Sequence, residues 1–135
     1  MSIHPYSRSP YVWFGGKSDV AEYTWLRFGA EVENFVDPFM GSCSILLGRP
    51  GWSQRSEYKE CVNDFDGFVS NFWRAIRADP EEVAYHADWP EYENDLHARH
   101  SWLVRRAEPM TAKLEGDPSW YNAKIAGWWA WGMAV

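Results

Sequence analysis

The residues best suited to chemistry lie in one short loop, residues 37–44, whose sequence is Asp-Pro-Phe-Met-Gly-Ser-Cys-Ser. A predicted buried strand, residues 32–36, leads into the loop, and a short predicted helix through residues 45–47 follows it. α/β folds build nucleotide-type sites in this way, because small residues let a ligand approach the backbone and the helix end offers unpaired N–H groups. Asp37, which follows the predicted strand, could point into such a site or cap the loop that it opens.

Two further blocks stand on either side of this loop in the sequence. Upstream, Trp13-Phe14-Gly15-Gly16-Lys17 joins two aromatic rings, a glycine turn and a cation. Lys17 could lie beside a ligand carboxylate, or it could be an exposed lysine after a turn. Downstream, Asp64 ends a second predicted strand, residues 58–63, where a carboxylate can hold ribose hydroxyls and Phe65 can pack on an adenine. Asp66 then caps the next helix, although either acid could be the cap.

In this order and at these spacings, the three blocks resemble the N-terminal half of a Dam-type DNA adenine-N6 methyltransferase of the sort found in phage genomes. The resemblance is specific from about residue 11 to residue 79 and looser beyond. It implies an α/β fold with a partial Rossmann-like methyltransferase sheet, flanking helices and a helical C-terminal part. It also implies an S-adenosylmethionine pocket formed by Trp13, Phe14, Gly15, Gly16, Lys17, Asp37, Pro38, Phe39, Gly41, Asp64 and Phe65.

The catalytic motif of that family, Asp-Pro-Pro-Tyr or a close relative, does not occur in these 135 residues. The Asp-Pro pairs begin at Asp37, Asp79 and Asp117, and Phe, Glu and Ser follow them. In the family the motif supplies an acceptor for the amino group of a flipped adenine and a ring that stacks on the base. We therefore expect weak binding of S-adenosylmethionine, no catalytic residue and no methyl transfer by the chain alone, which leaves open whether it is an enzyme.

The alternative interpretation belongs to a different class of function. The chain would be a truncated, phage-encoded methyltransferase relative that acts as a protein-interaction module, or as an inhibitor of a host defence complex of the restriction or CRISPR type. Ten Trp in a chain of this length favour aromatic packing in the core or at an interface. Several of them lie in residues 120–131, which predicts a protein partner or self-association through this end of the chain.

The overall charge bears on nucleic-acid binding. Lys and Arg number 13 against 19 Asp and Glu, a net charge of −6, whereas a free-standing DNA-binding domain is usually basic. DNA binding is therefore expected only together with an additional chain. The clearest local exception is the basic run of Arg99, Arg105 and Arg106, which could contact phosphates or could be a solvated helix face.

Outside the two strands, the chain is predicted to be mainly helical. Asp19, with Glu22 three positions on, is expected to cap a helix that ends at Gly29, with Ala21, Trp25 and Phe28 on its apolar face. Further helices are expected at residues 67–78, from Asp79-Pro80 onward, at residues 91–107 and at residues 120–135, with a linker at residues 109–118. Residues 1–80 would form the cofactor-binding part. Residues 81–135 would begin the target-recognition region or form an interaction surface.

Metal and membrane functions are not predicted. Cys43 and Cys61 show no Cys-x-x-Cys spacing, as expected of a reduced intracellular protein, and His97 and His100 lack an evident third ligand. The longest apolar stretch, residues 125–135, is too short to span a bilayer, and no secretory leader opens the sequence. We expect a soluble cytoplasmic protein, in the host cytoplasm if it is phage-encoded.

Overall fold

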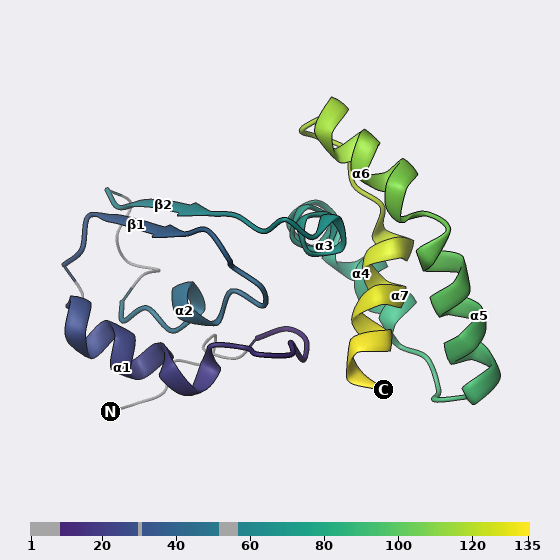
Figure 1. Ribbon diagram of the computed structural model, residues 1–135, viewed down its shortest axis with the longest axis horizontal. Helices are drawn as coiled ribbons and strands as arrows, with labels where there is room; N and C mark the ends of the chain where they lie inside the picture. The colour runs from purple at the N-terminus through teal and green to yellow at the C-terminus, as the bar shows by residue number, and fades with distance from the viewer. Residues whose placement is uncertain (1–8, 30, 52–56) are drawn as a thin grey trace. The chain divides into compact units, whose positions relative to one another are not determined.

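The computed structural model describes residues 9–29, 31–51 and 57–135, and the chain divides after Asp64 into two compact units. The first unit contains a parallel pair of strands, β1 (Asn34–Asp37) and β2 (Lys59–Val62), with Val36 opposite Cys61 and Asp37 opposite Val62. Two helices, α1 (Ser18–Phe28) and α2 (Ser44–Leu47), lie on the same side of the strands (Figure 1). The described residues thus combine helices with a small parallel sheet, consistent with an α/β methyltransferase-like fold; the Rossmann-like arrangement stays a prediction.

The core of the first unit is small and faces the two helices. It consists of Ala21, Trp25, Phe35 and Ile45, with Val32 and Leu46 packed against it. Burial alternates along β1, so that Phe35 and Asp37 are buried and Val36 is 67% exposed. The prediction of a buried strand at residues 32–36 is therefore wrong in two respects. The strand begins at Asn34, and only one of its faces is covered, since both helices lie on that face.

Helix α1 differs from the prediction at its N-terminus and agrees with it at its C-terminus. Lys17 occupies the N-cap position, and Asp19 lies within the first turn and does not cap the helix. An acid there is still favourable, because the first turn is the positive end of the helix dipole. Gly29 ends the helix with a positive φ of 79°, as predicted. Of the expected apolar face, Ala21 and Trp25 are buried, whereas Phe28 is largely exposed.

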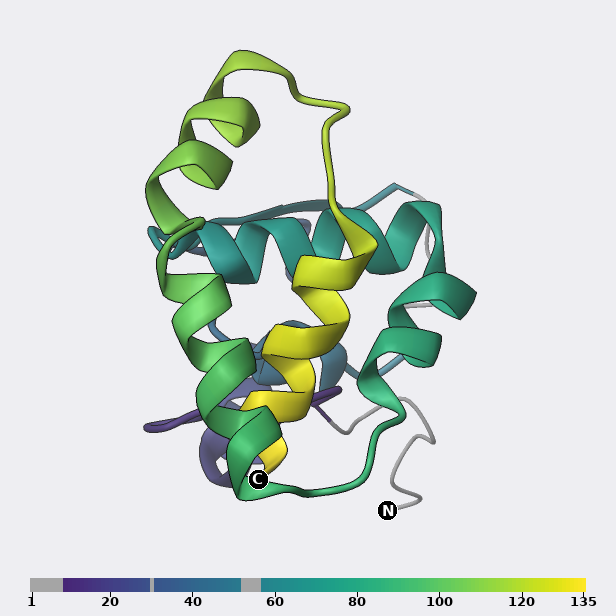
Figure 2. The same cartoon turned by 90° about the vertical axis from the view of Figure 1, so that its right-hand side faces the viewer.

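The second unit is helical, with α7 (Ala123–Ala134) in contact with α3 (Gly67–Ala78), α4 (Pro80–Ala87) and α5 (Glu93–Val104), and with α6 (Ala107–Gly116) in contact with α3 (Figure 2). The predicted bounds of α3 are confirmed, and its cap is Asp66, whose carboxylate accepts a hydrogen bond from the Phe68 N–H at 2.8 Å. The predicted start of α4 at Asp79-Pro80 is also confirmed. No helix among the described residues is both long and apolar enough to cross a membrane.

The helices expected at residues 91–107 and 120–135 are present but shorter, at Glu93–Val104 and Ala123–Ala134. Two other predictions for the second unit are wrong. The expected linker at residues 109–118 is mostly helix α6, in which Pro109 is the third residue. A proline is tolerated there because the first-turn N–H groups have no intrahelical partner. Arg99 does not contribute to a basic surface: it is buried, with its guanidinium near the rings of Trp89, Trp128 and Trp131.

Close packing and polar bonds join the helices of the second unit. The ring of Trp129 on α7 lies against Phe68 and Phe72 of α3, with centroid distances of 6.4 and 5.8 Å. The Asn71 side chain both donates to the Asn122 carbonyl and accepts from the Asn122 N–H, at 3.0 and 2.8 Å, which fixes the start of α7 against α3. At Gly127 the backbone of α4 is so near that an added Cβ would lie 2.6 Å from the Val83 carbonyl oxygen.

Candidate functional site

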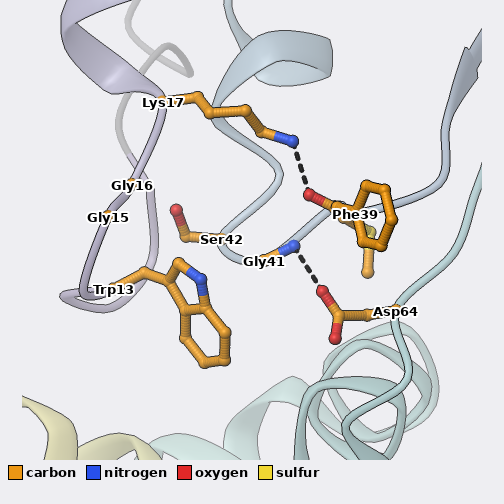
Figure 3. A pocket seen from close by; sticks show the side chains of 9 residues that line it. Trp13, Gly15, Gly16, Lys17, Phe39, Gly41, Ser42 and Asp64 are labelled. Atoms are coloured by element: carbon orange, nitrogen blue, oxygen red, sulfur yellow. Dashed lines mark hydrogen bonds between the residues drawn. The ribbon is translucent and has the colours of Figure 1, made fainter.

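The first unit contains a pocket of about 340 Å³, near the lower end of the range for small-molecule sites. Its wall comes from three segments: the turn before α1, the loop between β1 and α2, and the residue that follows β2 by two positions (Figure 3). The lining residues are Trp13, Gly15, Gly16, Lys17, Phe39, Met40, Gly41, Ser42 and Asp64. The three sequence blocks therefore meet at one place.

Lys17 is held at the pocket wall by the end of β1. Its ammonium group donates to both carboxylate oxygens of Asp37, each at 2.8 Å, and to the backbone carbonyl of Phe39. These three bonds match the three donors of a lysine ammonium group. Asp37 is buried and is not among the lining residues, so in this structure it orients Lys17 and forms an ion pair with it.

Asp64 joins the end of β2 to the glycine loop. One of its carboxylate oxygens accepts a hydrogen bond from the Gly41 N–H at 2.7 Å (Figure 3). A charge-assisted bond of this length strongly restrains both partners. The Met40 N–H also donates to the Asn63 carbonyl at 2.8 Å, which ties the same two segments together. Asp64 therefore combines a structural role with a position on the pocket wall.

The backbone conformation and the close packing at position 41 require a glycine. Its φ is +52°, in the region that favours glycine, and a Cβ would lie 2.6 Å from Nε1 of the Trp13 indole. The hydroxyl of Tyr11 donates to the Gly41 carbonyl at 2.7 Å, and the Tyr11 and Trp13 rings meet edge to face with centroids 6.0 Å apart. The aromatic segment before α1 thus packs directly on the glycine loop.

A group of serine hydroxyls supports the other side of the loop. The Ser44 Oγ lies 2.7 Å from the Ser9 Oγ, 3.0 Å from the Ser18 Oγ and 2.9 Å from the Ser42 Oγ. One hydroxyl can donate once and accept twice, so these contacts use the full capacity of Ser44. The group holds Ser42, which lines the pocket, between α1 and α2.

Cys43 is not suited to act as a nucleophile. Burial, together with the charge of Asp37, raises the pKa of its thiol from 9.0 to about 11. The thiolate is the reactive form of cysteine, and a raised pKa keeps this side chain in the thiol form near neutral pH. Its φ of +60° is unusual for a residue with a side chain. Among the described residues, no three His, Cys, Asp or Glu side chains are grouped to hold a metal ion.

Of the residues implicated by the sequence, the pocket brings together Trp13, Gly15, Gly16, Lys17, Phe39, Gly41 and Asp64. Four others do not line it: Phe14, which is 98% exposed, Asp37, Pro38, and Phe65, which is 100% exposed and begins the second unit. Met40 and Ser42 line the pocket and were missed. Both lie in the loop between β1 and α2, beside Gly41, so their position next to a predicted pocket residue was the signal that could have indicated them.

Comparison with known families decides the classification. Residues 13–104 match the family model of the D12 class N6 adenine-specific DNA methyltransferases. The chain belongs to this family. The match begins at Trp13, the first residue of the pocket wall, and continues through α5. Neither a curated protein nor a solved structure matches the chain. Membership of the D12 class relates the protein to DNA adenine methylation, for which enzymes of this class typically use S-adenosylmethionine.

The pocket residues of this D12 member fit such a cofactor in their chemistry. An adenine ring needs an apolar or aromatic surface, which Trp13 and Phe39 offer, and a ribose diol needs a fixed carboxylate, which Asp64 offers. The glycine-rich walls allow close approach of a ligand to the backbone. Lys17, already neutralised by Asp37, leaves the carboxylate of Asp64 as the remaining charge on the wall. A net negative wall suits a ligand that carries a sulfonium cation.

Proposed function

We propose that this chain is the S-adenosylmethionine-binding portion of a Dam-type DNA adenine-N6 methyltransferase, corresponding to the N-terminal half of such an enzyme. The observation that carries the proposal is the meeting of the Trp13–Lys17 turn, the Gly41 loop and Asp64 around one pocket in a D12 family member. Asp64 would take the ribose hydroxyls, and Trp13 and Phe39 would contact the adenine. Lys17 would face the carboxylate of the methionine part and would exchange one of its present bonds to Asp37 and Phe39 for a bond to that carboxylate.

The proposal does not assign methyl transfer to these residues alone. Transfer to adenine N6 requires the base to be flipped out of the duplex and its amino group to be held by an acceptor. No Asp-Pro-Pro triplet occurs in the 135 residues, and the buried acid of the pocket region, Asp37, is already bonded to Lys17. The acceptor would come from another polypeptide segment. When bound, S-adenosylmethionine would supply the methyl group, and the residues described would bind and orient it.

Titration calorimetry with S-adenosylmethionine tests the proposal. We expect weak binding by the wild-type chain. Asp64→Ala should weaken it by about 1–3 kcal/mol, because the ribose acceptor and the bond to Gly41 are lost together. Asp19→Asn, which removes one exposed negative charge from the first turn of α1, serves as the matched control and should bind like wild type. Absence of binding heat at millimolar ligand would exclude the pocket as a cofactor site.

A second candidate function is the protein-interaction module of a truncated phage-encoded relative, including an inhibitor of a host defence complex. The Trp-rich segment that suggested it contributes mainly to the second unit's own core, since Trp129 and Trp131 are buried. The observation that still favours it is a set of exposed aromatic side chains on and after α4, namely Tyr85, Trp89 and Tyr92. A stable monomer in light scattering that captures no protein from host lysate would remove this candidate.

A further inference from the structure

Two cations of the second unit rest on indole rings where α5 meets α7. The guanidinium of Arg106 lies 3.5 Å from the centre of the Trp102 ring. The ammonium of Lys124 lies 4.4 Å from the centre of the Trp128 ring and 5.3 Å from that of Trp102. The two rings are themselves in contact, with centroids 4.9 Å apart. Arg106 and Lys124 are called the indole-backed cations below.

Neither indole-backed cation is neutralised by a carboxylate. Within the described ranges, no Asp or Glu oxygen lies within 4.0 Å of Arg106 or Lys124. This is notable in a chain of net charge −6. The acids of the second unit are concentrated elsewhere: residues 79–95 contain seven Asp and Glu and no Lys or Arg, whereas residues 99–124 contain five Lys and Arg and three acids. Charge is thus segregated along the helices.

The rings also restrict where the two charges can go. The Arg106 guanidinium lies over the Trp102 ring, and one of its five N–H groups donates to the Trp102 carbonyl at 3.3 Å. The others remain for an external acceptor. Lys124 is exposed, and its ammonium lies near two half-buried rings, those of Trp102 and Trp128. The two charges share the Trp102 ring, with distances of 3.5 and 5.3 Å from its centre, so they lie at most about 9 Å apart. Two restrained cations within this distance, without acidic partners, are complementary to closely spaced anions.

We propose that the indole-backed cations Arg106 and Lys124, supported by Trp102 and Trp128, contact phosphates of duplex DNA. A phosphodiester backbone presents closely spaced anions along its whole length, and stacked arginines are well suited to phosphate. The choice of DNA over another polyanion rests on the proposed function. The indole-backed cations are not the basic run predicted from the sequence. Arg99 of that run is buried, and Lys124, from a different helix, lies near the same Trp102 ring as Arg106. The two cations provide a local positive site in an acidic protein.

Fluorescence anisotropy with a short labelled duplex, measured over a series of salt concentrations, tests the proposal on the full chain. The variant Arg106→Gln/Lys124→Gln should reduce the slope of log affinity against log salt by about 1.8, since two phosphate contacts are lost. At the lowest salt its affinity should fall roughly tenfold or more. Arg106→Lys/Lys124→Arg, which retains both charges, should bind more tightly than the glutamine variant.

The matched control is Arg27→Gln/Arg77→Gln, which removes two charges from the exposed last turns of α1 and α3. It should change the slope far less than the test variant. Three results would overturn the proposal: no duplex binding by wild type at the lowest salt, equal losses in control and test variants, or displacement by polyglutamate as effective as by duplex. The last would indicate an acidic protein as the partner.

Calorimetry with S-adenosylmethionine separates this proposal from the proposed function. The double glutamine variant should retain wild-type cofactor affinity, because both substitutions lie in the second unit and the pocket lies in the first. If the wild-type chain binds duplex DNA through these cations but does not bind the cofactor, the proposed function fails and the DNA-contacting surface stands. If it binds the cofactor and not DNA, the reverse holds.

Discussion

Among the residues that the structure describes, each of the two units has an arginine buried beneath aromatic rings, and the two arginines are held by different interactions. Arg49, in the first unit, is 1% exposed and lies over Tyr58 and Trp25, with its guanidinium carbon 4.1 and 5.1 Å from their ring centres. Its nitrogens also donate to the Glu60 carboxylate at 2.8 Å and to the Val32 carbonyl. It therefore connects β2 to the segment before β1 by directional bonds.

Arg99, in the second unit, is held almost entirely by rings. It is 7% exposed and lies 4.5–5.0 Å from the ring centres of Trp89, Trp128 and Trp131. Its Nη1 finds no hydrogen-bond partner among the residues that the structure describes. Burial lowers the pKa of its guanidinium below the ordinary value, against the opposing effect of Asp95. The charge is thus desolvated and only partly compensated.

The contrast extends to the rest of each unit. Around the pocket, the Lys17–Asp37 pair, the Asp64–Gly41 bond and the serine hydroxyls fix individual atoms, and only a small apolar core lies beneath them. In the helical unit, the α4–α7 and α3–α7 contacts depend mainly on the fit of backbones and rings, and the two Asn71–Asn122 bonds add directional contacts at the start of α7. A unit that must present polar atoms to a ligand gains from directional bonds, whereas one that presents a surface can be stabilised largely by close packing. The following predictions test this difference.

The largest effect is expected at Arg49. Arg49→Met should lower the free energy of unfolding by about 3 kcal/mol, because the Glu60 carboxylate and the Val32 carbonyl lose a buried partner. Urea unfolding followed by circular dichroism measures it. Arg27→Met, in the exposed last turn of α1, is the control and should change stability by less than about 0.5 kcal/mol. Equal stability of Arg49→Met and wild type would show that rings, not hydrogen bonds, hold this arginine.

An intermediate effect is expected at Gly127 on α7. Gly127→Ala should cost about 1–3 kcal/mol, since the added Cβ would lie 2.5 Å from the His86 Cβ and 2.6 Å from the Val83 carbonyl oxygen. Gly132→Ala, in open space on the same helix, should instead gain up to about 1 kcal/mol from helix propensity. Thermal unfolding of both variants gives the comparison. A neutral Gly127→Ala would mean that α4 and α7 adjust readily, contrary to packing by shape.

Much of the local structure could be predicted because its causes are local. The bounds of α3 follow from the Asp66 cap and a regular apolar spacing, and the start of α4 follows from Asp79-Pro80. Helix α6 was missed because Pro109 suggests a break, although a proline in a first turn removes no intrahelical bond. Two of the three residues predicted for the apolar face of α1, Ala21 and Trp25, are buried, and Phe28 is exposed. Which side of a helix is covered depends on elements distant in sequence.

The sequence predicted which segments form the candidate site, but it did not predict which side chains bond to each other there. Lys17, Gly41 and Asp64 were singled out by their types and positions, and all three line one pocket. The Lys17–Asp37 pair was not foreseen, because its members are 20 positions apart and each had a plausible role of its own. The burial of Arg99 likewise depends on Trp128 and Trp131 from another helix, which no pattern around residue 99 reveals.

The smallest effect is expected for replacement of Arg99 by Met, and this variant decides between the two ways of holding an arginine. Arg99→Met should leave the free energy of unfolding within about 1 kcal/mol of wild type. The loss of attraction to three rings is offset by relief of desolvation and by sulfur–aromatic contacts of the thioether. Arg99→Ala should cost more, about 2–3 kcal/mol, because it leaves a cavity among the rings. These two results together would show that the volume of the Arg99 side chain, and not its charge, stabilises the second unit. If Arg99→Met proved as damaging as Arg49→Met in the same urea titration, the charge itself would stabilise the helical unit, and the two arginines would be alike in kind.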